Sequence, residues 1–340
     1  MRAAVAFSGG LDSTASAVLL KHQGFDVLAM HMLLGEMNPG ATQAIAEAID
    51  VEYATLDATA DFESLVIEPF IHGYLDGLTP NPCVTCNHDV KFGILLEEAR
   101  SRGCEYLATG HYARIADCDG TPYRILKGVD LKKDQSYVLW TLSQKILKHV
   151  LFPVGELTKG KVEKLVREAG VRDMVQPDSQ DICFLSGRSY CELLESRAPE
   201  AIQPGPIVDT GGRVLGRHEG LAFYTVGQRH GLGLGGHRAL YVTELRPTDN
   251  TLVVSGIEDR KSREFAIHSV NLTPGDVPTG IISCEVVTRY QGKPLPAEVE
   301  IYPDKTGKVR YTEPGPPAAP GQSAVFYRGD ELLGGSIISG

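Results

Sequence analysis

The sequence predicts an α/β fold in which a parallel sheet with helices on both faces, over residues 1–202, is followed by two small β domains, the last of them a β-barrel. Three observations support this class. Strand-like and helix-like segments alternate in the first part of the chain, long helical patterns end before Gln203, and short strand-like runs separated by turn residues fill the rest. A length of 340 residues suits two or three domains, which we expect at 1–202, 203–263 and 264–340.

The first part of the chain contains four strand patterns that alternate with helical patterns. The strands are expected at Ala3–Phe7, Val27–Met32, Val51–Leu56 and Tyr106–Thr109, and the helices at Ser13–His22, Ala41–Ile49, Phe62–Tyr74 and Lys91–Arg100. Short apolar strands between helices are typical of a parallel sheet that is buried on both faces. Ligands of such sheets bind beyond the carboxyl ends of the strands, where Ser8–Ser13 and Gly110-His111 lie.

The rest of the chain changes from helical to strand patterns. Two further helices are expected at Gln144–Val150 and Leu157–Ala169, before a turn-rich stretch at Asp173–Glu192. Pro204-Gly205-Pro206 then marks a domain boundary. The strands expected after it are Pro206–Asp209, Ala239–Thr243, Thr251–Ser255, Cys284–Thr288, Ala297–Ile301 and Ala324–Tyr327. A break near Arg260–Phe265 divides them into a central β domain and the final barrel.

A glycine-rich turn, Ser8-Gly9-Gly10-Leu11-Asp12-Ser13, joins the first strand to the first helix. Bare backbone N–H groups at a helix N-terminus bind phosphate, and Ser8 and Ser13 add hydroxyl donors. Asp12 by itself would repel phosphate, so its presence indicates a bridging cation such as Mg²⁺. The loop has no lysine and therefore differs from the G-x-x-x-x-G-K-[ST] loop of kinases and GTPases. The alternative interpretation is a tight turn without a ligand.

Net charge, apolar runs and the number of cysteines limit the classes of protein to which the chain is expected to belong. The formal net charge of −10 argues mildly against a nucleic-acid partner, because phosphate binding favours a basic face. Apolar runs are far shorter than the roughly 20 residues of a membrane span, and the start at Met1-Arg2 lacks a signal-peptide pattern. We therefore expect a cytoplasmic protein with no membrane partner. The seven cysteines are odd in number, so a disulfide framework is not expected.

Thr79-Pro80-Asn81-Pro82-Cys83-Val84-Thr85-Cys86-Asn87 places two cysteines three residues apart, after an approach that two prolines make rigid. Such cysteines form a redox pair, form half of a metal site, or are neighbours by accident. A Cys₄ zinc ribbon is excluded because the chain has no second C-x-x-C. Cys183, on the turn-rich stretch, is a third thiol that could converge with Cys83 and Cys86.

These segments, together with several others, resemble the tRNA 2-thiouridylase family of the PP-loop ATP pyrophosphatases. The matching stretches are S-G-G-L-D-S at 8–13, T-P-N-P-x-x-x-C-N at 79–87, T-G-H-Y-A-R at 109–114, K-D-Q-S-Y at 133–137, D-I-C-F at 181–184, Y-T-V-G-Q-R at 224–229, T-R-Y at 288–290 and P-G-Q-S-A-V-F-Y at 320–327. The resemblance covers essentially the whole chain. It implies an ATP-dependent enzyme that adenylates the C2 oxygen of the wobble uridine in certain tRNAs. Sulfur then replaces that oxygen to give 2-thiouridine, and AMP and pyrophosphate are released.

The resemblance also implies roles for single residues. Cys183 would carry a persulfide received from a sulfur-donor protein, either a cysteine desulfurase or a sulfur relay protein. Cys86 would activate that sulfur, either by releasing hydrosulfide or by forming a disulfide with Cys183 as the sulfur is transferred. ATP with Mg²⁺ would be held by Ala6, Phe7, Ser8, Gly9, Gly10, Leu11, Asp12, Ser13, Met32 and Gly110. The target base would face Asn81, Pro82 and Cys83. The tRNA would contact His111, Lys133, Asp134, Gln135, Arg289, Tyr290 and Gln322.

Two departures from the family pattern leave alternatives open. The family often has Asp at position 83, whereas Cys83 with Cys86 and Cys183 resembles the three cysteines of tRNA thiolases that hold a 4Fe–4S cluster. Cys183 would then be a cluster ligand and not a sulfur carrier. The segment 33–38 after Met32 is shorter than usual, which puts in doubt any contact made by a longer insertion and would suit a divergent paralogue.

Two other functions compete with thiolation. A divergent ATP pyrophosphatase of the amidating-ligase type, acting on another RNA or on a small molecule, would explain the ATP loop but not the cysteine motif or the β domains. A non-catalytic RNA-binding or sulfur-carrier protein would need neither an intact loop nor three thiols. ATP–pyrophosphate exchange separates the enzymes from the carrier, and dependence on tRNA separates the two enzymes. The sequence carries no signal for the oligomeric state.

Overall fold

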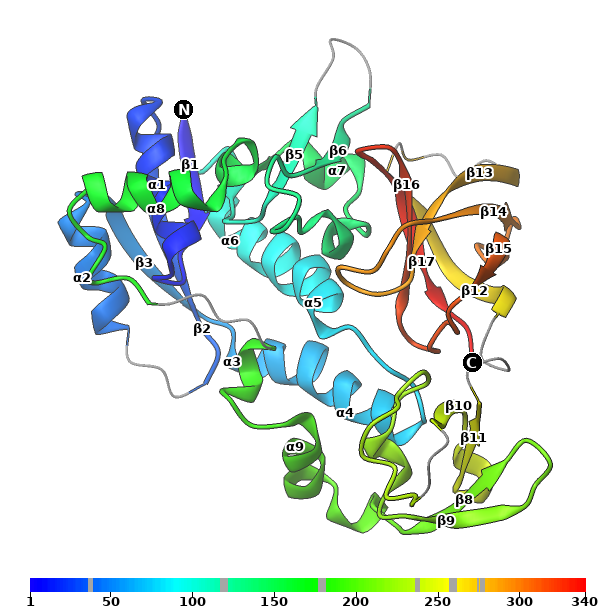
Figure 1. The fold of residues 1–340 in the computed structure, drawn as a ribbon. Helices are drawn as coiled ribbons and strands as arrows, with labels where there is room; N and C mark the ends of the chain where they lie inside the picture. Colours follow the sequence, from blue (N-terminus) through cyan, green and yellow to red (C-terminus); the bar gives the residue numbers. More distant parts are fainter. Residues whose placement is uncertain are drawn as a thin grey trace.

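The computed structural model describes residues 1–35, 39–116, 122–176, 182–235, 239–256, 262–273, 275 and 279–340. It has three parts, a sheet covered by helices, a small sheet at the bottom of Figure 1, and a barrel at the right. Cys118, Asp181 of the D-I-C-F motif and the end of the short segment after Met32 lie outside the described residues. Within the described ranges, no helix has the length and apolar character needed to cross a bilayer.

Five parallel strands form the first sheet, in the order β3-β2-β1-β4-β7. They are β1 (Arg2–Ala6), β2 (Asp26–Leu33), β3 (Glu52–Asp57), β4 (Tyr106–Ala108) and β7 (Val150–Leu151). The predicted parallel sheet is therefore confirmed, with β7 as an additional edge strand. Since the chain runs from β1 toward β2 on one side and later places β4 on the other, the sheet has its topological switch point at β1 and β4, where ligands of such sheets bind.

Helices cover both faces of this sheet, as the sequence predicts (Figure 1). The helices on one face are α1 (Leu11–His22), α2 (Gly40–Ala48) and α8 (Lys159–Glu168). A helical column covers the other face and consists of α5 (Pro82–Thr85), wider π-type turns over Cys86–Leu95, and α6 (Leu96–Ser101). Sheet residues that face the column include Leu28 and Leu107, which are fully buried against it.

This column begins at Pro82, well before the helix start expected at Lys91. Proline is favoured in the first turn of a helix because it has no N–H group to leave unbonded. Val84 and Val90 are buried along the column, so the helical conformation also buries apolar surface there. The cysteine motif therefore lies on the first turns of a helix. The helix expected at Phe62–Tyr74 also starts earlier, as α3 (Thr59–Phe62), and continues through π-type turns into α4 (Glu68–Leu75).

The second part is a four-stranded sheet in the order β10-β11-β8-β9. Its strands are β8 (Gly205–Asp209), β9 (Val214–His218), β10 (Tyr241–Arg246) and β11 (Thr251–Ser255). Before this sheet, α9 (Tyr190–Arg197) occupies the end of the stretch that was expected to be turn-rich. Ser189 and Glu192 form a capping box at its start, a local signal that the turn residues around it obscured.

The third part is a closed antiparallel barrel of six strands in the order β12-β15-β14-β13-β16-β17, with β12 also pairing with β17. The strands are β12 (Ser262–Leu272), β13 (Gly280–Val287), β14 (Leu295–Ile301), β15 (Gly307–Gly315), β16 (Ser323–Arg328) and β17 (Glu331–Ile338). This confirms the predicted final barrel. The expected domain boundary at 263/264 falls inside β12, so we propose to place it before Ser262.

A hairpin from the first part of the chain ties the barrel to the first sheet unit. It consists of β5 (Ala113–Ala116) and β6 (Arg124–Lys127), and β6 pairs with β17 of the barrel. After the hairpin, just ahead of α7 (Gln144–Leu147), the Tyr137 hydroxyl donates to the Ser323 carbonyl at 2.9 Å and the Trp140 ring N–H donates to the Ser323 hydroxyl at 3.0 Å. Trp140 and Tyr137 are buried. These contacts set where the barrel presents its loops to the first sheet.

Candidate active site

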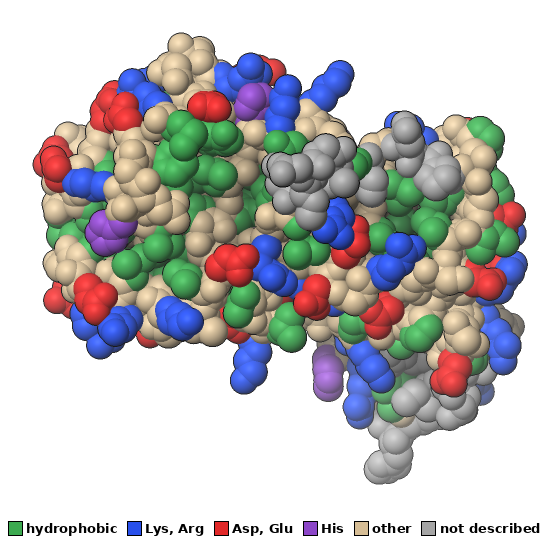
Figure 2. All heavy atoms as spheres, turned by 90° about the horizontal axis from the view of Figure 1, so that it is seen from above, with side chains coloured by type: hydrophobic (Ala, Val, Ile, Leu, Met, Phe, Trp, Pro, Cys, Tyr) green, Lys and Arg blue, Asp and Glu red, His purple; other side chains and the backbone are tan. Residues whose placement is uncertain are grey.

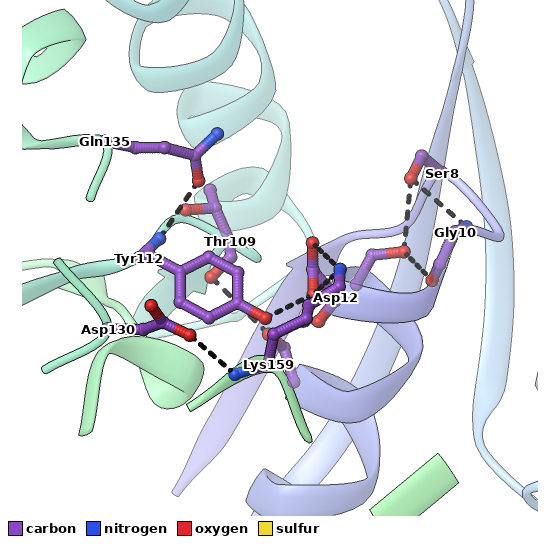
Figure 3. A network of polar contacts seen from close by, with 10 residues as sticks. Ser8, Gly10, Asp12, Thr109, Tyr112, Asp130, Gln135 and Lys159 are labelled. Atoms are coloured by element: carbon purple, nitrogen blue, oxygen red, sulfur yellow. Dashed lines mark hydrogen bonds and ion pairs between the residues drawn. The ribbon is translucent and has the colours of Figure 1, made fainter. Parts of the chain in front are cut away.

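The loop Ser8–Ser13 follows β1 at the carboxyl edge of the sheet (Figure 3). Gly9 has a φ of +74°, a backbone conformation that favours glycine. The Ser8 and Ser13 hydroxyls lie 3.2 Å apart, and the Ser13 hydroxyl donates to the Gly10 carbonyl at 3.0 Å. Gly10 is the N-cap residue of α1 and offers no side-chain acceptor to the first N–H groups of that helix. The first N–H groups of α1 therefore suit an anion.

Gly110 brings a second loop against this one. It follows β4, which pairs with β1. A Cβ atom at position 110 would stand 2.9 Å from the backbone carbon of Asp12 and 3.0 Å from the backbone nitrogen of Ser13. Only a residue without a side chain allows that approach. The expected ATP residues of the two loops are thus in direct contact at the switch point of the sheet.

Asp12 takes part in a polar network that the sequence did not reveal (Figure 3). The Lys159 ammonium lies 2.9 Å from one carboxylate oxygen of Asp12 and 3.0 Å from the other, and the Tyr112 hydroxyl donates to Asp12 at 2.8 Å. A carboxylate beside a phosphate loop suits Mg²⁺. Asp12 would hold that ion, which neutralises phosphate charge when bound, only after Lys159 has moved away. Tyr112 lies within the T-G-H-Y-A-R stretch, but no sequence signal links Lys159 to Asp12.

Three further residues expected at the ATP site lie along β1 and β2. Ala6 and Met32 are half-buried on the face of the sheet that the helical column covers, and Phe7 is buried on the other face. His31 donates a hydrogen bond from Nδ1 to the Phe7 carbonyl at 2.8 Å, and this bond stabilises the end of β1. Met32 also packs against the apolar cluster that contains Cys86. Met32 therefore packs both against the core cluster that Ala6 contacts and against the cluster that holds Cys86.

The three cysteines of interest share one neighbourhood. Cys86 is 8% exposed and lies in an apolar cluster with Phe62 and Val66, against which Phe184 packs. The Phe184 ring meets that of Phe62 edge-on at 5.9 Å, so its neighbour Cys183 is placed beside this cluster. Cys83 and Cys183 are reached by solvent. The structure thus combines one buried thiol with two accessible ones.

Burial raises the pKa of the Cys86 thiol to about 11, and the nearby Cys183 and Cys83 act in the same direction. Surrounding protein atoms also raise the pKa of Cys83, although part of that residue is exposed. The ammonium of Lys91 opposes both shifts. Lys91 is a site residue that the sequence analysis missed, and its place two helical turns beyond Cys83 on the same helical column was the available signal.

Replacement of Lys91 by methionine is expected to raise the pKa of both thiols, because a neighbouring cation is lost. Alkylation of Cys86 by iodoacetamide at fixed pH should then be roughly three- to tenfold slower. In the unmodified protein the rate should rise with pH throughout the range 7–9, since the reactive thiolate is the minor form below a pKa of about 11. Mass spectrometry of the labelled peptide measures both effects. Lys91→Arg should restore the original rate, and equal rates in all three proteins would contradict the role given to Lys91.

The three cysteines do not form a ready metal site. Among the described residues, which include Cys83, Cys86 and Cys183, no three His, Cys, Asp or Glu side chains are arranged to hold a metal ion. This finding concerns a single metal ion, so a 4Fe–4S cluster held by the three thiols stays a prediction. No step below passes through such a cluster.

Some of the expected tRNA positions surround the cysteine motif. Asn81 and Pro82 begin the helical column, and Arg289 and Tyr290 are exposed on the barrel loop after β13. The Tyr290 ring lies 6.1 Å from that of Tyr137. Partial burial raises the pKa of Tyr290, and Asp134 and Cys83 lie close enough to raise it further. A barrel residue thus lies near the cysteine motif, although the two are far apart in sequence.

Gln322 reaches the same region from another barrel turn. The neighbouring Gly321 packs so closely that a Cβ there would stand 2.9 Å from the Thr79 backbone nitrogen, and Thr79 donates to the Pro320 carbonyl at 2.7 Å. On the face seen in Figure 2, Lys and Arg side chains are interspersed with Asp and Glu and do not gather in one basic field. Recognition of RNA on that face would therefore depend on individual contacts more than on bulk charge.

Of the other expected tRNA positions, His111 is buried, whereas Lys133, Asp134 and Gln135 are half-buried. His111 is buried between Phe92 and Phe152, and its Nδ1 lies 2.7 Å from the Thr109 hydroxyl. Burial holds the pKa of His111 well below its usual range, and Lys91 lowers it further, so the ring is neutral.

The K-D-Q-S-Y stretch likewise stabilises its own loop. Asp134 accepts hydrogen bonds from the Gly128 N–H at 3.0 Å and from the Ser136 hydroxyl at 2.8 Å. The Gln135 side-chain oxygen accepts from the Tyr112 N–H at 3.0 Å. Lys133 is half-buried. In this arrangement the side chains of Asp134 and Gln135 hold the loop beside Tyr112.

Comparison with known proteins gives consistent matches over the whole chain. Residues 1–187 match the family model described as the tRNA methyl transferase HUP domain, residues 192–256 the tRNA methyl transferase PRC-barrel domain, and residues 262–338 the aminomethyltransferase beta-barrel domain. The chain is 41% identical to the tRNA-specific 2-thiouridylase MnmA of Herpetosiphon aurantiacus, over 98% of this chain and 97% of that one. Proteins of the same name from Carboxydothermus hydrogenoformans and Clostridioides difficile are 40% and 36% identical, over 98% of this chain and 96% and 97% of theirs.

One solved structure that is similar to this chain overlaps with it only in part. This structure, described as a predicted subunit of tRNA methyltransferase from Methanocaldococcus jannaschii, is 19% identical over 49% of this chain and 76% of that one, with a TM-score of 0.33. An overlap of that quality supports no argument about the site.

Proposed function

This chain belongs to the tRNA-specific 2-thiouridylase family and is a tRNA-uridine 2-sulfurtransferase, and we propose that it acts by adenylating the C2 oxygen of a wobble uridine and replacing that oxygen with sulfur. A tRNA is its macromolecular substrate. We expect it to act in the cytoplasm and to receive sulfur from a cysteine desulfurase or a sulfur relay protein.

The first step is the adenylation of the uridine. A uracil carbonyl is a poor electrophile, so its oxygen has to become a better leaving group before sulfur can replace it. The C2 oxygen attacks the α-phosphorus of ATP, the bond between the α and β phosphates breaks, and pyrophosphate leaves with the electron pair. We expect the backbone N–H groups at the start of α1 and the hydroxyls of Ser8 and Ser13, which lie 3.2 Å apart, to bind the phosphates.

The second step is the transfer of sulfur. The terminal sulfur of a persulfide on Cys183 attacks C2 of the adenylated uridine. The Cys86 thiolate attacks the inner sulfur of Cys183, so a Cys86–Cys183 disulfide forms, AMP departs with the former C2 oxygen, and 2-thiouridine results. A dithiol reductant then reduces the Cys86–Cys183 disulfide, which restores both thiols, and the reductant is itself oxidised to a disulfide. The exposure of Cys183 suits loading by a donor protein, and burial of Cys86 protects the reacting thiol from solvent.

One observation carries this proposal. Met32, at the end of β2 beside the ATP loop, packs against the same apolar cluster that holds Cys86 and receives Phe184 from the Cys183 segment. This contact supports the proposal that nucleotide chemistry and sulfur chemistry take place in one site. An amidating ligase would need the ATP loop but not these thiols, and a carrier protein would need neither the loop nor the contact of Gly110 with it.

The test is to supply the purified chain with ATP, Mg²⁺, unmodified tRNA, a persulfide donor and a dithiol. We expect 2-thiouridine in nuclease digests of the tRNA, measured by mass spectrometry, with one AMP and one pyrophosphate formed per modified base. Omission of tRNA should stop AMP formation. AMP formation that proceeds without tRNA would favour the amidating ligase, and the absence of any ATP turnover would favour a carrier protein.

A further inference from the structure

The sulfur-transfer cycle proposed above uses Cys86 and Cys183 and leaves Cys83 without a part in it. Cys83 is nevertheless in the same neighbourhood, since Cys183 lies close enough to Cys83 and to Cys86 to raise the pKa of both thiols. Cys83 is also exposed to solvent. An accessible thiol beside a disulfide can attack one of its sulfur atoms and take its place in the bond. Cys83 is therefore a candidate for thiol–disulfide exchange.

The local helix holds Cys83 next to Cys86. The helix α5 starts at Pro82, and Thr85 and Cys86 continue it with φ angles of −61° and −58°. Residues three apart on a helix are neighbours, with Cβ atoms roughly 5–6 Å apart, whereas a disulfide needs about 3.5–4.5 Å. Asn81 before the helix is extended, so no earlier helical turn restrains Pro82 and Cys83. A Cys83–Cys86 bond therefore needs only a slight tightening of this first turn.

Exposure decides which sulfur of a Cys86–Cys183 disulfide Cys83 would attack. Cys86 is buried in its apolar cluster, and burial raises the pKa of its thiol to about 11, so Cys86 is a poor leaving group. Cys183 is exposed, and water stabilises a departing thiolate there. Attack on the Cys86 sulfur, with Cys183 leaving, is therefore favoured over the reverse. The Lys91 ammonium lowers the pKa of Cys83 and thereby favours the attacking thiolate.

Cys83 also has an advantage over a reductant in solution. Its thiol is held within one helical turn of Cys86, and the effective concentration of such a neighbouring group is far above the concentration of a dissolved thiol. A dissolved dithiol would also have to approach Cys86 past Phe184, which packs on the cluster around it. We therefore expect exchange with Cys83 to precede reduction from solution.

We propose that Cys83 is the resolving thiol of the sulfur-transfer cycle, which attacks the Cys86 sulfur of the Cys86–Cys183 disulfide and frees Cys183 for its next load of sulfur. The proposal rests on the function proposed above and deepens its last step. The Cys83 thiol gives its proton to water, and its thiolate forms a bond with Cys86 as the bond from Cys86 to Cys183 breaks. Cys183 leaves as a thiolate and takes up a proton from water. The dithiol therefore meets a Cys83–Cys86 disulfide, which it reduces while it is itself oxidised.

The first test maps disulfides and needs neither tRNA nor ATP. The reduced protein is treated with one equivalent of diamide, free thiols are blocked with N-ethylmaleimide, and peptides are analysed by mass spectrometry. In the unmodified protein we expect the Cys83–Cys86 bond to predominate, and in Cys83→Ser the Cys86–Cys183 bond. Cys284→Ser is the matched control, because it removes a half-buried cysteine on β13 of the barrel, and it should give the pattern of the unmodified protein.

The second test follows thiolation over several rounds with limiting dithiothreitol. The rate of the later rounds is divided by the rate of the first round, so an effect of the substitution on base binding cancels. In Cys83→Ser this ratio should fall by on the order of tenfold or more. A high concentration of dithiothreitol should restore it, since direct reduction then replaces the exchange. Cys83→Ala should behave like Cys83→Ser, and circular dichroism confirms that each variant is folded.

A Cys86–Cys183 bond that persists in the unmodified protein while Cys83 stays free would overturn the proposal, as would equal ratios in the unmodified protein and in folded Cys83→Ser. Loss of the first round in Cys83→Ser would also contradict it, because a resolving thiol acts only after the first disulfide has formed. Failure of the proposed function has a different signature. In that case the disulfide maps are as expected, yet the unmodified protein itself forms no 2-thiouridine.

Discussion

Replacement of Cys86 by alanine is expected to abolish the formation of 2-thiouridine, with a loss of on the order of a thousandfold or more, as is typical when a nucleophile is removed. Cys86 is buried in the cluster with Phe62 and Val66, and Phe184 brings the Cys183 segment against it. Among the described residues, this cluster contains no second buried cysteine that could take the place of Cys86. Nucleoside analysis by mass spectrometry measures the loss.

The same variant should bind ATP normally. Cys86 contributes nothing to the loop Ser8–Ser13, and alanine fits the apolar cluster with a small loss of packing. Titration of ATP, followed by calorimetry, separates the two properties. Cys284→Ala is the matched control, because that cysteine lies half-buried on β13 of the barrel. Thiolation by Cys86→Ala at the control rate would refute the role assigned to Cys86.

Gly110→Ala should weaken ATP binding by roughly ten- to a hundredfold, because a methyl group there meets the backbone of the ATP loop. Its carbon would stand 2.9 Å from the Asp12 carbonyl carbon and 3.0 Å from the Ser13 nitrogen. Backbone atoms cannot turn aside as a flexible side chain can, so α1 or the loop after β4 has to shift. Overpacking of this kind costs about 1–3 kcal/mol of stability. The shift would also displace the N–H groups that we expect to bind phosphate.

The control for this substitution is Gly160→Ala. Gly160 lies in α8 with open space where its Cβ would be, and alanine is favoured over glycine in a helix by about 1 kcal/mol. We expect Gly160→Ala to be as stable as the unmodified protein or slightly more stable, with unchanged affinity for ATP. Thermal unfolding and ATP titration measure both. Normal ATP affinity in Gly110→Ala would show that the two loops need not be in contact.

The sheet with its helices was predictable because its signals are local. Strands such as β1 and β2 are continuous apolar runs, and glycine-rich turns and helical spacing separate them. The barrel was predictable as a class but not strand by strand. β12, β15 and β17 were not expected, since β12 begins with mostly exposed residues and β17 contains Gly334-Gly335. Glycine weakens a strand pattern, yet a Cβ at Gly335 would stand 2.8 Å from the Trp140 ring.

The candidate site, like the fold, was predictable where its signals are local in the sequence. The motifs named the loop Ser8–Ser13, the cysteines and the barrel positions, because each is a short run of characteristic residues. The residues that contact those motifs could not be predicted from the sequence. Lys159 pairs with Asp12 across 147 positions, and Tyr290 reaches the region of Cys83 from the barrel. Nothing in the residues around Lys159 indicates which carboxylate it meets.

The sequence by itself therefore determined the class of fold and the family, and it suggested the chemistry that we propose for the loop and the thiols, since these depend on residue type and local spacing. Only the tertiary structure decided that Cys86 is buried while Cys83 and Cys183 are exposed, that Asp12 is paired with Lys159, and that His111 is a neutral residue of the interior. Burial and charge pairing depend on which distant segments pack together. That packing is set by the pairing of β6 with β17 and by the helices on either face of the first sheet.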